Sequence, residues 1–369
     1  MGLGDHRVTT SSSRGRPLKP ATIRDVASRA AVSVASVSRV LNGAGPVALE
    51  TRDRVMEAVR ELSYVPHSGA RSLSMRRTDT VGVILPDLHG EFFSELIRGL
   101  DRAARERGLH LLVSSSHDDE AEVEAALGSM RGRVDGIIIM SPHLDPAAVA
   151  GGMARSVPVV ALSGDGGRGD VAGIGIDNAG GARAITAHLI EGGARCVAHI
   201  RGPRGHSEAE ARMAGYAAGV AEAGQTTMVE SGDFTQASGY RAMHALLERN
   251  PRPDAVFAAN DTMAIGALLA IREAGLRLPE DIALGGFDDV PMAALLRPAL
   301  TTMRISIAEL GERALARLAG AIQSRRAAAP ADADVEIVRP LLVVRQSTFN
   351  HRQGGGQSPA PFSEERQDA

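Results

Sequence analysis

The sequence predicts an N-terminal all-α helix-turn-helix module, followed by an α/β core of two doubly wound parallel-sheet subdomains. Three short amphipathic helices come within about 45 residues of Pro20, which is the size of a small helical module. From Thr80 onward, apolar segments of strand length alternate with amphipathic helices, the pattern of parallel sheets covered by helices. Roughly 260 residues of this alternation exceed one typical domain, which predicts two subdomains.

Length and composition limit the class of protein. The 369 residues carry a formal net charge of −3 and one cysteine, Cys196, which cannot close an intramolecular disulfide. No apolar run reaches the roughly 18 residues of a membrane span, and residues 1–20 lack the apolar segment of a signal peptide. We therefore expect a cytoplasmic location and no membrane partner.

The net charge is unevenly distributed along the chain. Residues 1–79 contain thirteen basic and seven acidic side chains, a formal charge of +6, and the total of −3 therefore leaves −9 for the rest. A basic N-terminal segment on an acidic body indicates a polyanionic partner for that segment alone.

The first helix is predicted to begin after residues 1–20, which read as a disordered basic arm. Thr22 and Asp25 form a capping-box pattern, and apolar residues then recur at helical spacing. Within the arm, Arg14-Gly-Arg-Pro17 looks like the core of an AT-hook, a minor-groove reader, or else like a generic basic tail.

The second helix carries the candidate DNA-reading residues. Ser33 can cap it, Val37 and Val40 face inward, and Asn42-Gly43 ends it. A third helix is expected from about Leu49 to Leu62. In a helix-turn-helix the second helix enters the major groove, where an arginine such as Arg39 can donate two hydrogen bonds to guanine. A plain three-helix bundle with a solvated arginine face is the alternative, and the +6 charge makes it less favoured.

Eight apolar segments of the remaining chain are candidate strands. They are Val81–Leu85, Leu111–Ser114, Gly136–Met140, Val159–Leu162, Ala172–Ile176, Val197–Ile200, Ala255–Ala258 and Ile282–Gly286. Helical stretches such as Phe92–Arg107 and Ala182–Glu191 lie between them. Ligands of such sheets bind beyond the carboxyl ends of the strands, so the loops there are the expected ligand site.

At this point the motifs resemble those of the LacI/GalR family of bacterial transcription regulators, over residues 20–347. The N-terminal segment carries Thr22-Ile-Arg-Asp-Val-Ala27, Val32-Ser-Val-Ala-Ser-Val-Ser-Arg-Val-Leu-Asn-Gly43, Leu62-Ser-Tyr-Val-Pro-His67 and Ala70-Arg-Ser-Leu73. The core carries Ile84-Leu-Pro-Asp87, Phe92-Phe93, Ile176-Asp-Asn178, Arg212-Met-Ala-Gly-Tyr216, Ala259-Asn-Asp-Thr-Met-Ala264, Gly285-Gly-Phe-Asp-Asp289 and Leu300-Thr-Thr302.

The resemblance implies a DNA-binding domain at residues 21–65 and a hinge helix with linker at 66–78. The DNA-contacting residues that it implies are Thr22, Ser33, Val34, Ala35, Ser38, Arg39, Asn42, His67, Ala70, Arg71 and Leu73. Leu73 would wedge into the minor groove. Three residues depart from the family pattern: Ala31 replaces a usual turn glycine, His67 an asparagine and Gly69 an alanine.

For the core, the resemblance implies a periplasmic-binding-protein-like fold over residues 79–347. The N-subdomain would comprise about 79–192 and 304–328, the C-subdomain about 193–303 and 329–347, and 348–369 would be a disordered tail. The implied effector-binding residues are Phe92, Phe93, His206, Glu208, Arg212, Phe234, Asn260 and Asp288, with Asp87 as a further candidate. Taken singly, Asp288 could instead cap a helix, Arg212 form a surface ion pair and Phe93 belong to the core.

The expected function is a transcriptional repressor, not an enzyme. It would bind double-stranded operator DNA with palindromic symmetry as a homodimer, under control of a small-molecule effector, with a sugar or sugar derivative as the leading choice. A purine-responsive regulator is one alternative, and a cytoplasmic small-molecule-binding protein without operator function is another. The sequence lacks a nucleophile elbow, a phosphate-binding loop and zinc-spaced ligands, which argues against an enzyme. We expect no cofactor and no metal site.

Overall fold

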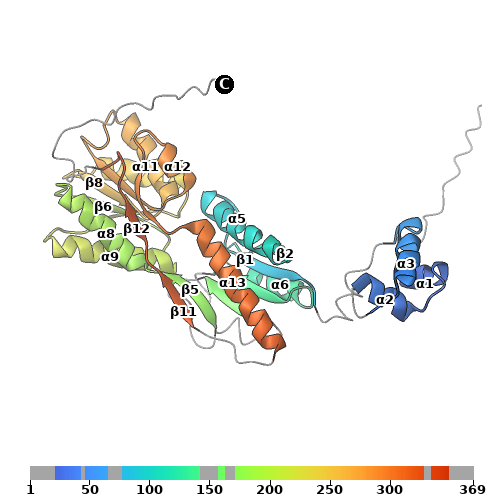
Figure 1. Ribbon diagram of the computed structural model, residues 1–369. Helices are drawn as coiled ribbons and strands as arrows, with labels where there is room; N and C mark the ends of the chain where they lie inside the picture. The colour runs from blue at the N-terminus through green and yellow to red at the C-terminus, as the bar shows by residue number, and fades with distance from the viewer. Residues whose placement is uncertain are drawn as a thin grey trace, which may run out of the picture. The chain divides into compact units, whose positions relative to one another are not determined.

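The computed structural model describes residues 21–42, 46–64, 77–117, 119–141, 157–162, 171–327 and 334–348 (Figure 1). The chain divides into two compact units, Met1–Thr78 and Asp79–Ala369. Several predictions concern residues outside the described part: the arm with Arg14–Pro17, the hinge residues His67, Gly69, Ala70, Arg71 and Leu73, and the tail from residue 349 on.

The first unit contains the three expected helices, α1 (Ile23–Arg29), α2 (Val34–Asn42) and α3 (Leu49–Glu61). Their apolar faces meet in one small core that includes Val26, Val37, Val40, Val55, Ala58 and Tyr64. Helical spacing of small apolar residues thus gives each short helix a buried face, which three such helices need for mutual stability.

The local signals at the start of these helices act as expected. The backbone N–H of Asp25 donates to Thr22 Oγ1, and the Asp25 carboxylate accepts from the Thr22 backbone N–H at 2.8 Å, a complete capping box. Ser33 Oγ accepts from the Ser36 backbone N–H at 3.1 Å and so caps α2. Between α1 and α2, Ala31 has φ of 51°, a left-handed conformation that glycine adopts more readily.

The second unit contains two six-stranded sheets, and each sheet is the centre of one subdomain. The sheet of the N-subdomain has the order β11-β5-β4-β3-β1-β2 and is parallel throughout. Its strands are β1 (Thr80–Leu85), β2 (His110–Ser115), β3 (Gly136–Ile139), β4 (Val159–Leu162), β5 (Ala172–Ile176) and β11 (Val335–Val338).

The sheet of the C-subdomain has the order β12-β10-β9-β8-β6-β7, with only the edge strand β12 antiparallel. Its strands are β6 (Val197–Arg201), β7 (Met228–Ser231), β8 (Ala255–Ala258), β9 (Ala283–Asp288), β10 (Thr301–Arg304) and β12 (Leu341–Val343). The central strands are buried on both faces, as parallel sheets require.

Helices cover both faces of each sheet (Figure 1). In the N-subdomain, α5 (Glu91–Glu106) and α13 (Ile307–Arg326) pack together on one face and α6 (Glu120–Met130) covers the other. In the C-subdomain the pairs are α8 (Asn178–Glu191) with α9 (Ser207–Glu222) and α10 (Gln236–Leu247) with α11 (Asp261–Glu273), and α12 (Pro291–Leu295) is short.

Three boundaries differ from the sequence-based expectation. We expected residues up to 192 in the N-subdomain, but α8 packs against α9 and the second sheet, so the chain already crosses after β5. We expected 329–347 in the C-subdomain, but β11 pairs with β5 of the first sheet. The expected tail began at residue 348, but Thr348 is buried, and its hydroxyl lies 2.8 Å from Thr301 Oγ1.

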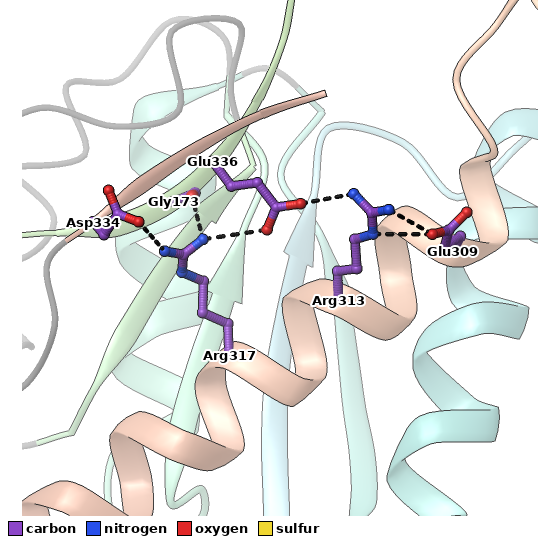
Figure 2. A network of polar contacts seen from close by, with 6 residues as sticks. All are labelled: Gly173, Glu309, Arg313, Arg317, Asp334 and Glu336. Atoms are coloured by element: carbon purple, nitrogen blue, oxygen red, sulfur yellow. Dashed lines mark hydrogen bonds and ion pairs between the residues drawn. The ribbon is translucent and has the colours of Figure 1, made fainter. Parts of the chain in front are cut away.

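A network of charged side chains holds the edge strand β11 against α13 (Figure 2). Arg313 Nη1 donates to Glu336 at 2.7 Å, and Arg317 contacts Glu336, Asp334 and the carbonyl oxygen of Gly173 at 3.4 Å each. Because every residue of β11 is at least partly exposed, apolar burial alone attaches it weakly. The network attaches this short edge strand, in which Glu336 interrupts three apolar residues, to α13.

Candidate functional site

The first candidate site is the outer face of α2. Val34 is 41% exposed, Ala35 and Arg39 are exposed as well, and Ser38 is half-buried. No acidic residue lies in the sequence of α2, so nothing on the helix itself opposes an approaching phosphate. The small apolar pair can contact thymine methyl groups and the guanidinium can donate to a base edge.

Other predicted DNA-contacting residues lie next to this face or outside the described chain. Thr22 and Ser33 are exposed and cap α1 and α2, and Asn42 is the last residue of α2. His67, Ala70, Arg71 and Leu73 lie outside the described residues, as stated above.

The second candidate site is a cavity of about 450 Å³ in the second unit, lined by both subdomains. It brings together all eight residues predicted to bind an effector, namely Phe92, Phe93, His206, Glu208, Arg212, Phe234, Asn260 and Asp288, and also Asp87. The cavity lies where the fold class predicts a ligand site, beyond the carboxyl ends of parallel strands. Asp87 comes shortly after β1, Met140 directly after β3, Asn260 shortly after β8, and Asp288 ends β9.

Aromatic rings form apolar walls on both sides of the cavity. Phe92 and Phe93, in the first turn of α5, pack edge to face with centroids 5.2 Å apart. Opposite them in the other subdomain, Phe234 meets the His206 ring edge to face at 5.0 Å. Such faces can stack on the apolar face of a ring ligand.

Arg212 on α9 is the cationic centre of the cavity, with a side chain only 6% exposed. Nε donates to Asn178 Oδ1 at 2.8 Å, Nη1 donates to the carbonyl oxygen of Ala259 at 2.5 Å, and Nη2 lies 3.3 Å from Asp288 Oδ1. The guanidinium carbon sits 3.8 Å from the centroid of the Phe287 ring. Arg212 is therefore a fixed, buried cation and not a surface ion pair.

Asp288 faces this cation from the end of β9. Its carboxylate is buried, and Oδ1 has the ion pair with Arg212 but no well-directed hydrogen bond from any described residue. Burial raises the pKa of Asp288 to about 6, against the opposing effect of Arg212. It caps no helix, since α12 begins after Val290. Asp288 is therefore a buried carboxylate in the cavity lining, with Oδ1 facing the Arg212 guanidinium.

Asp261 supports this loop from behind. Its buried carboxylate accepts from Thr302 Oγ1 at 2.6 Å and from the backbone N–H of Val290 at 3.0 Å. Burial, together with the nearby charge of Asp288, raises the pKa of Asp261 well above its ordinary value. These hydrogen bonds tie the segment after Asp288 to β10.

His206 and Glu208 form a second buried polar pair. His206 Nδ1 lies 3.0 Å from Glu208 Oε2, and Ser207 Oγ donates to the same oxygen at 2.9 Å. Burial by itself raises the pKa of Glu208, but the hydrogen bonds and charge of His206 and the Ser207 hydroxyl hold it below its ordinary value. Glu208 is thus ionised at neutral pH.

Asn260 is already engaged by the protein itself. Oδ1 accepts from the backbone N–H of Met263 at 2.8 Å and caps α11, while Nδ2 donates to the carbonyl oxygen of Phe234 at 3.1 Å. Phe234 has φ of 67°, and this hydrogen bond helps to hold that strained residue at the cavity wall.

Sequence reasoning missed several lining residues, among them His89, Glu91, Asp233 and Thr235. Asp233 and Thr235 flank Phe234 in the loop between β7 and α10, and the resemblance pointed to Phe234 alone in that loop. Glu91 is the first residue of α5, and its carboxylate accepts from the backbone N–H of Met292 across the two subdomains at 3.0 Å. Its position at the start of a helix that follows a parallel strand could have identified Glu91 as a cavity residue.

The described residues contain no group of three or more His, Cys, Asp or Glu side chains placed to hold a metal ion. Among the helices described, none has the length and hydropathy of a membrane span.

Two family models match the chain. Residues 22–67 match the bacterial regulatory proteins of the lacI family, and residues 186–348 match a periplasmic binding protein-like domain. A curated relative, the HTH-type transcriptional repressor PurR of Pectobacterium carotovorum, is 37% identical over 335 residues, which is 89% of this chain and 96% of the relative.

Solved structures are similar over the same span. The Lac repressor dimer bound to operator and the anti-inducer ONPF has a TM-score of 0.80 at 30% identity, and the similarity covers 90% of this chain and all of that one. The complex of the transcriptional regulator CelR with cellobiose has a TM-score of 0.66 at 33% identity, covering 89% of this chain and 99% of that one.

Proposed function

The chain belongs to the LacI family of bacterial regulatory proteins, and from that membership we infer that it is a transcriptional repressor that binds operator DNA and a small-molecule effector. One observation carries this function. The same chain has an exposed Arg39 on the second helix of a helix-turn-helix unit and, in its other unit, a cavity enclosing the buried pair Arg212 and Asp288. A sugar-binding protein without operator function would not need a helix-turn-helix unit with an exposed arginine on its second helix.

The repressor acts as a homodimer on a palindromic operator. One recognition helix reads only a half-site, so two-fold protein symmetry matches a two-fold operator. The dimeric assembly of the similar Lac repressor structure supports this. We assign DNA contact to Thr22, Ser33, Val34, Ala35, Ser38, Arg39 and Asn42, and to His67, Ala70, Arg71 and the wedge Leu73 in the hinge.

The effector is a sugar or sugar derivative. Carboxylate acceptors, a fixed guanidinium and phenyl rings in one cavity suit a ligand rich in hydroxyl groups with an apolar ring face. The similar CelR structure holds cellobiose, which supports this class. A flat purine base between Phe92 and Phe234 is the alternative.

The protein is not an enzyme, and it works in the cytoplasm, where the DNA that it controls is accessible. The cavity polar groups bind and orient a ligand, and the family to which the chain belongs consists of regulators.

Selection of binding sites from genomic fragments tests this function. The full-length protein should enrich fragments that share a palindromic sequence, and affinity for that sequence should fall steeply with rising salt. Arg39→Ala should weaken binding by about 5- to 150-fold, the effect of losing one bidentate base contact of ~1–3 kcal/mol. Arg60→Ala on α3 is the matched control, because it removes the same charge from an exposed arginine that pairs with Glu57.

Arg60→Ala should leave the enriched sequence and its affinity nearly unchanged. Equal losses for the two variants, or no enrichment by the wild type, would overturn the assignment.

A further inference from the structure

We propose that the cavity selects an uncharged effector bearing hydroxyl groups and rejects ligands that carry a phosphate or carboxylate group. This inference rests on the proposed role of the cavity as the effector site and specifies the chemical class of its ligand.

The charges that line the cavity are mostly negative. Five carboxylates line it, those of Asp87, Glu91, Glu208, Asp233 and Asp288, whereas Arg212 is the only arginine or lysine among the described lining residues. Even with both lining histidines, His89 and His206, protonated, the formal charge of this lining is negative. An anionic ligand would therefore enter a field of its own sign.

Arg212 is not available as an anion receptor. Its charge faces Asp288 at 3.3 Å, and its other two nitrogens donate to Asn178 and to the carbonyl oxygen of Ala259. A phosphate would have to displace the Asp288 carboxylate from this buried guanidinium. Losing one partner of a buried ion pair is costly, so the displacement opposes binding.

Four helices begin at the cavity, and a helix N-terminus by itself attracts anions. Each of these ends is already compensated by the protein. Glu91 and Glu208 lie in the first turns of α5 and α9. Thr235 caps α10 and is itself held by Asp233, which accepts from its N–H at 3.0 Å, and Asn260 caps α11.

The same groups suit hydroxyl donors. Five carboxylates line the cavity, Asp87 among them is exposed, and an ionised carboxylate accepts from two neighbouring hydroxyl groups at once. Phe92 and Phe234 supply apolar surface for the ring that carries those hydroxyls. Among its described lining residues, the cavity therefore offers acceptors and ring faces, and its single arginine is paired with a carboxylate.

Matched pairs of ligands test the inference. The full-length protein is mixed with ribose and ribose 5-phosphate, glucose and glucose 6-phosphate, cellobiose and cellobionate, and guanosine and guanosine monophosphate, and thermal shift and calorimetry record binding. For every pair with a detectable ligand, we expect the uncharged member to bind at least about tenfold more tightly than the charged member.

Each outcome decides a different statement. If a phosphorylated or carboxylated member binds with equal or greater affinity than its uncharged partner, the proposed preference for uncharged ligands is wrong. The assignment of the cavity as the effector site is then still supported. If no member binds, the assignment of the cavity as a small-molecule site is wrong, and so is the proposed preference for uncharged ligands.

A charge variant makes the test independent of which sugar binds best. Asp87 is exposed at the cavity, so Asp87→Asn should fold normally while removing one negative charge from the lining. The preference for the uncharged member should fall by about three- to tenfold. Glu124→Gln on the outer helix α6 makes the same charge change on a residue that does not line the cavity, and it should leave the preference unchanged. An unchanged preference in Asp87→Asn would contradict the electrostatic cause.

Discussion

Asp288 combines a strained backbone conformation with a buried, charged side chain. It has φ of 108°, its carboxylate is buried, and it faces Arg212 without a complete set of hydrogen bonds. Such a conformation costs about 1–3 kcal/mol and persists only when its surroundings fix it. Asp261 provides that support through its hydrogen bonds to Val290 and Thr302.

The pH dependence of folding should report the burial of Asp288. Its folded-state pKa of about 6 lies above the value of roughly 3.9 for an exposed aspartate. The folded protein therefore binds this proton more readily than the unfolded chain. Lowering the pH from 7 to 5 should stabilise the wild type through this group by about 1 kcal/mol.

Asp288→Asn lacks this titrating carboxyl group, so its free energy of unfolding should increase less between pH 7 and pH 5. Urea unfolding of both proteins at pH 7 and pH 5 measures the difference. The same change in unfolding midpoint for wild type and variant would mean that Asp288 titrates as an exposed carboxyl group.

Individual residues differ in how far sequence alone identified them. The eight residues that the resemblance implied all line the cavity, and the resemblance also drew attention to Ala31, whose positive φ is one that glycine adopts more readily. It could not reveal that Asn260 is occupied in capping α11 and holding Phe234, because a side chain's partners depend on loops distant in sequence.

Glycine residues allow several pairs of helices to pack closely against each other. A Cβ atom on Gly266 of α11 would collide with the carbonyl oxygen of Gln236, the first residue of α10, and one on Gly239 of α10 would collide with that of Met263. The same holds for Gly99 of α5 against Ala308 of α13. These helix pairs therefore need glycine for their spacing, although glycine is a poor helix former.

Two glycine-to-alanine substitutions should have opposite effects on stability. Gly266→Ala should destabilise the protein by at least about 2 kcal/mol, since α10 and α11 would have to separate. Gly128→Ala on α6 is the control, because its added Cβ has nothing within 4 Å apart from its chain neighbours and the adjacent backbone of its own helix, and it should stabilise by about 0.5–1 kcal/mol.

Denaturant unfolding of the two variants beside the wild type measures both effects. A stabilising or neutral Gly266→Ala would show that the helices can shift apart without loss.

At the level of whole elements, the eight expected strands all form, whereas β7, β10, β11 and β12 were not expected. Seven of the eight are buried along most or all of their length, and the eighth, the edge strand β2, has no buried residue but carries the apolar run Leu111–Val113. By contrast, two of the four residues of β7 are polar, Glu336 interrupts β11, and β10 begins with two threonines. Their place in the sheets depends on neighbours far away in sequence, such as Arg313 and Arg317 for β11, which local hydrophobicity cannot report.

In the molecule as a whole, charge and function divide at the same place. The boundary between the two compact units follows Thr78, and the segment up to residue 79 carries +6 while the remainder carries −9. The basic unit suits phosphates, and the acidic unit, with its negatively lined cavity, suits an uncharged ligand. The sequence revealed this division, but the exact course of the chain between subdomains required the pairing of β11 with β5.

The central claim is that ligand binding in the cavity controls operator binding by the same chain. Fluorescence anisotropy of labelled operator, with and without a saturating ligand from the pair tests, measures it directly, and calorimetry gives the ligand Kd with and without operator. Thermodynamic linkage requires that the ligand change the operator Kd by the same factor by which the operator changes the ligand Kd, typically about 5- to 150-fold. A ligand that binds the cavity but leaves the operator Kd unchanged would contradict the account.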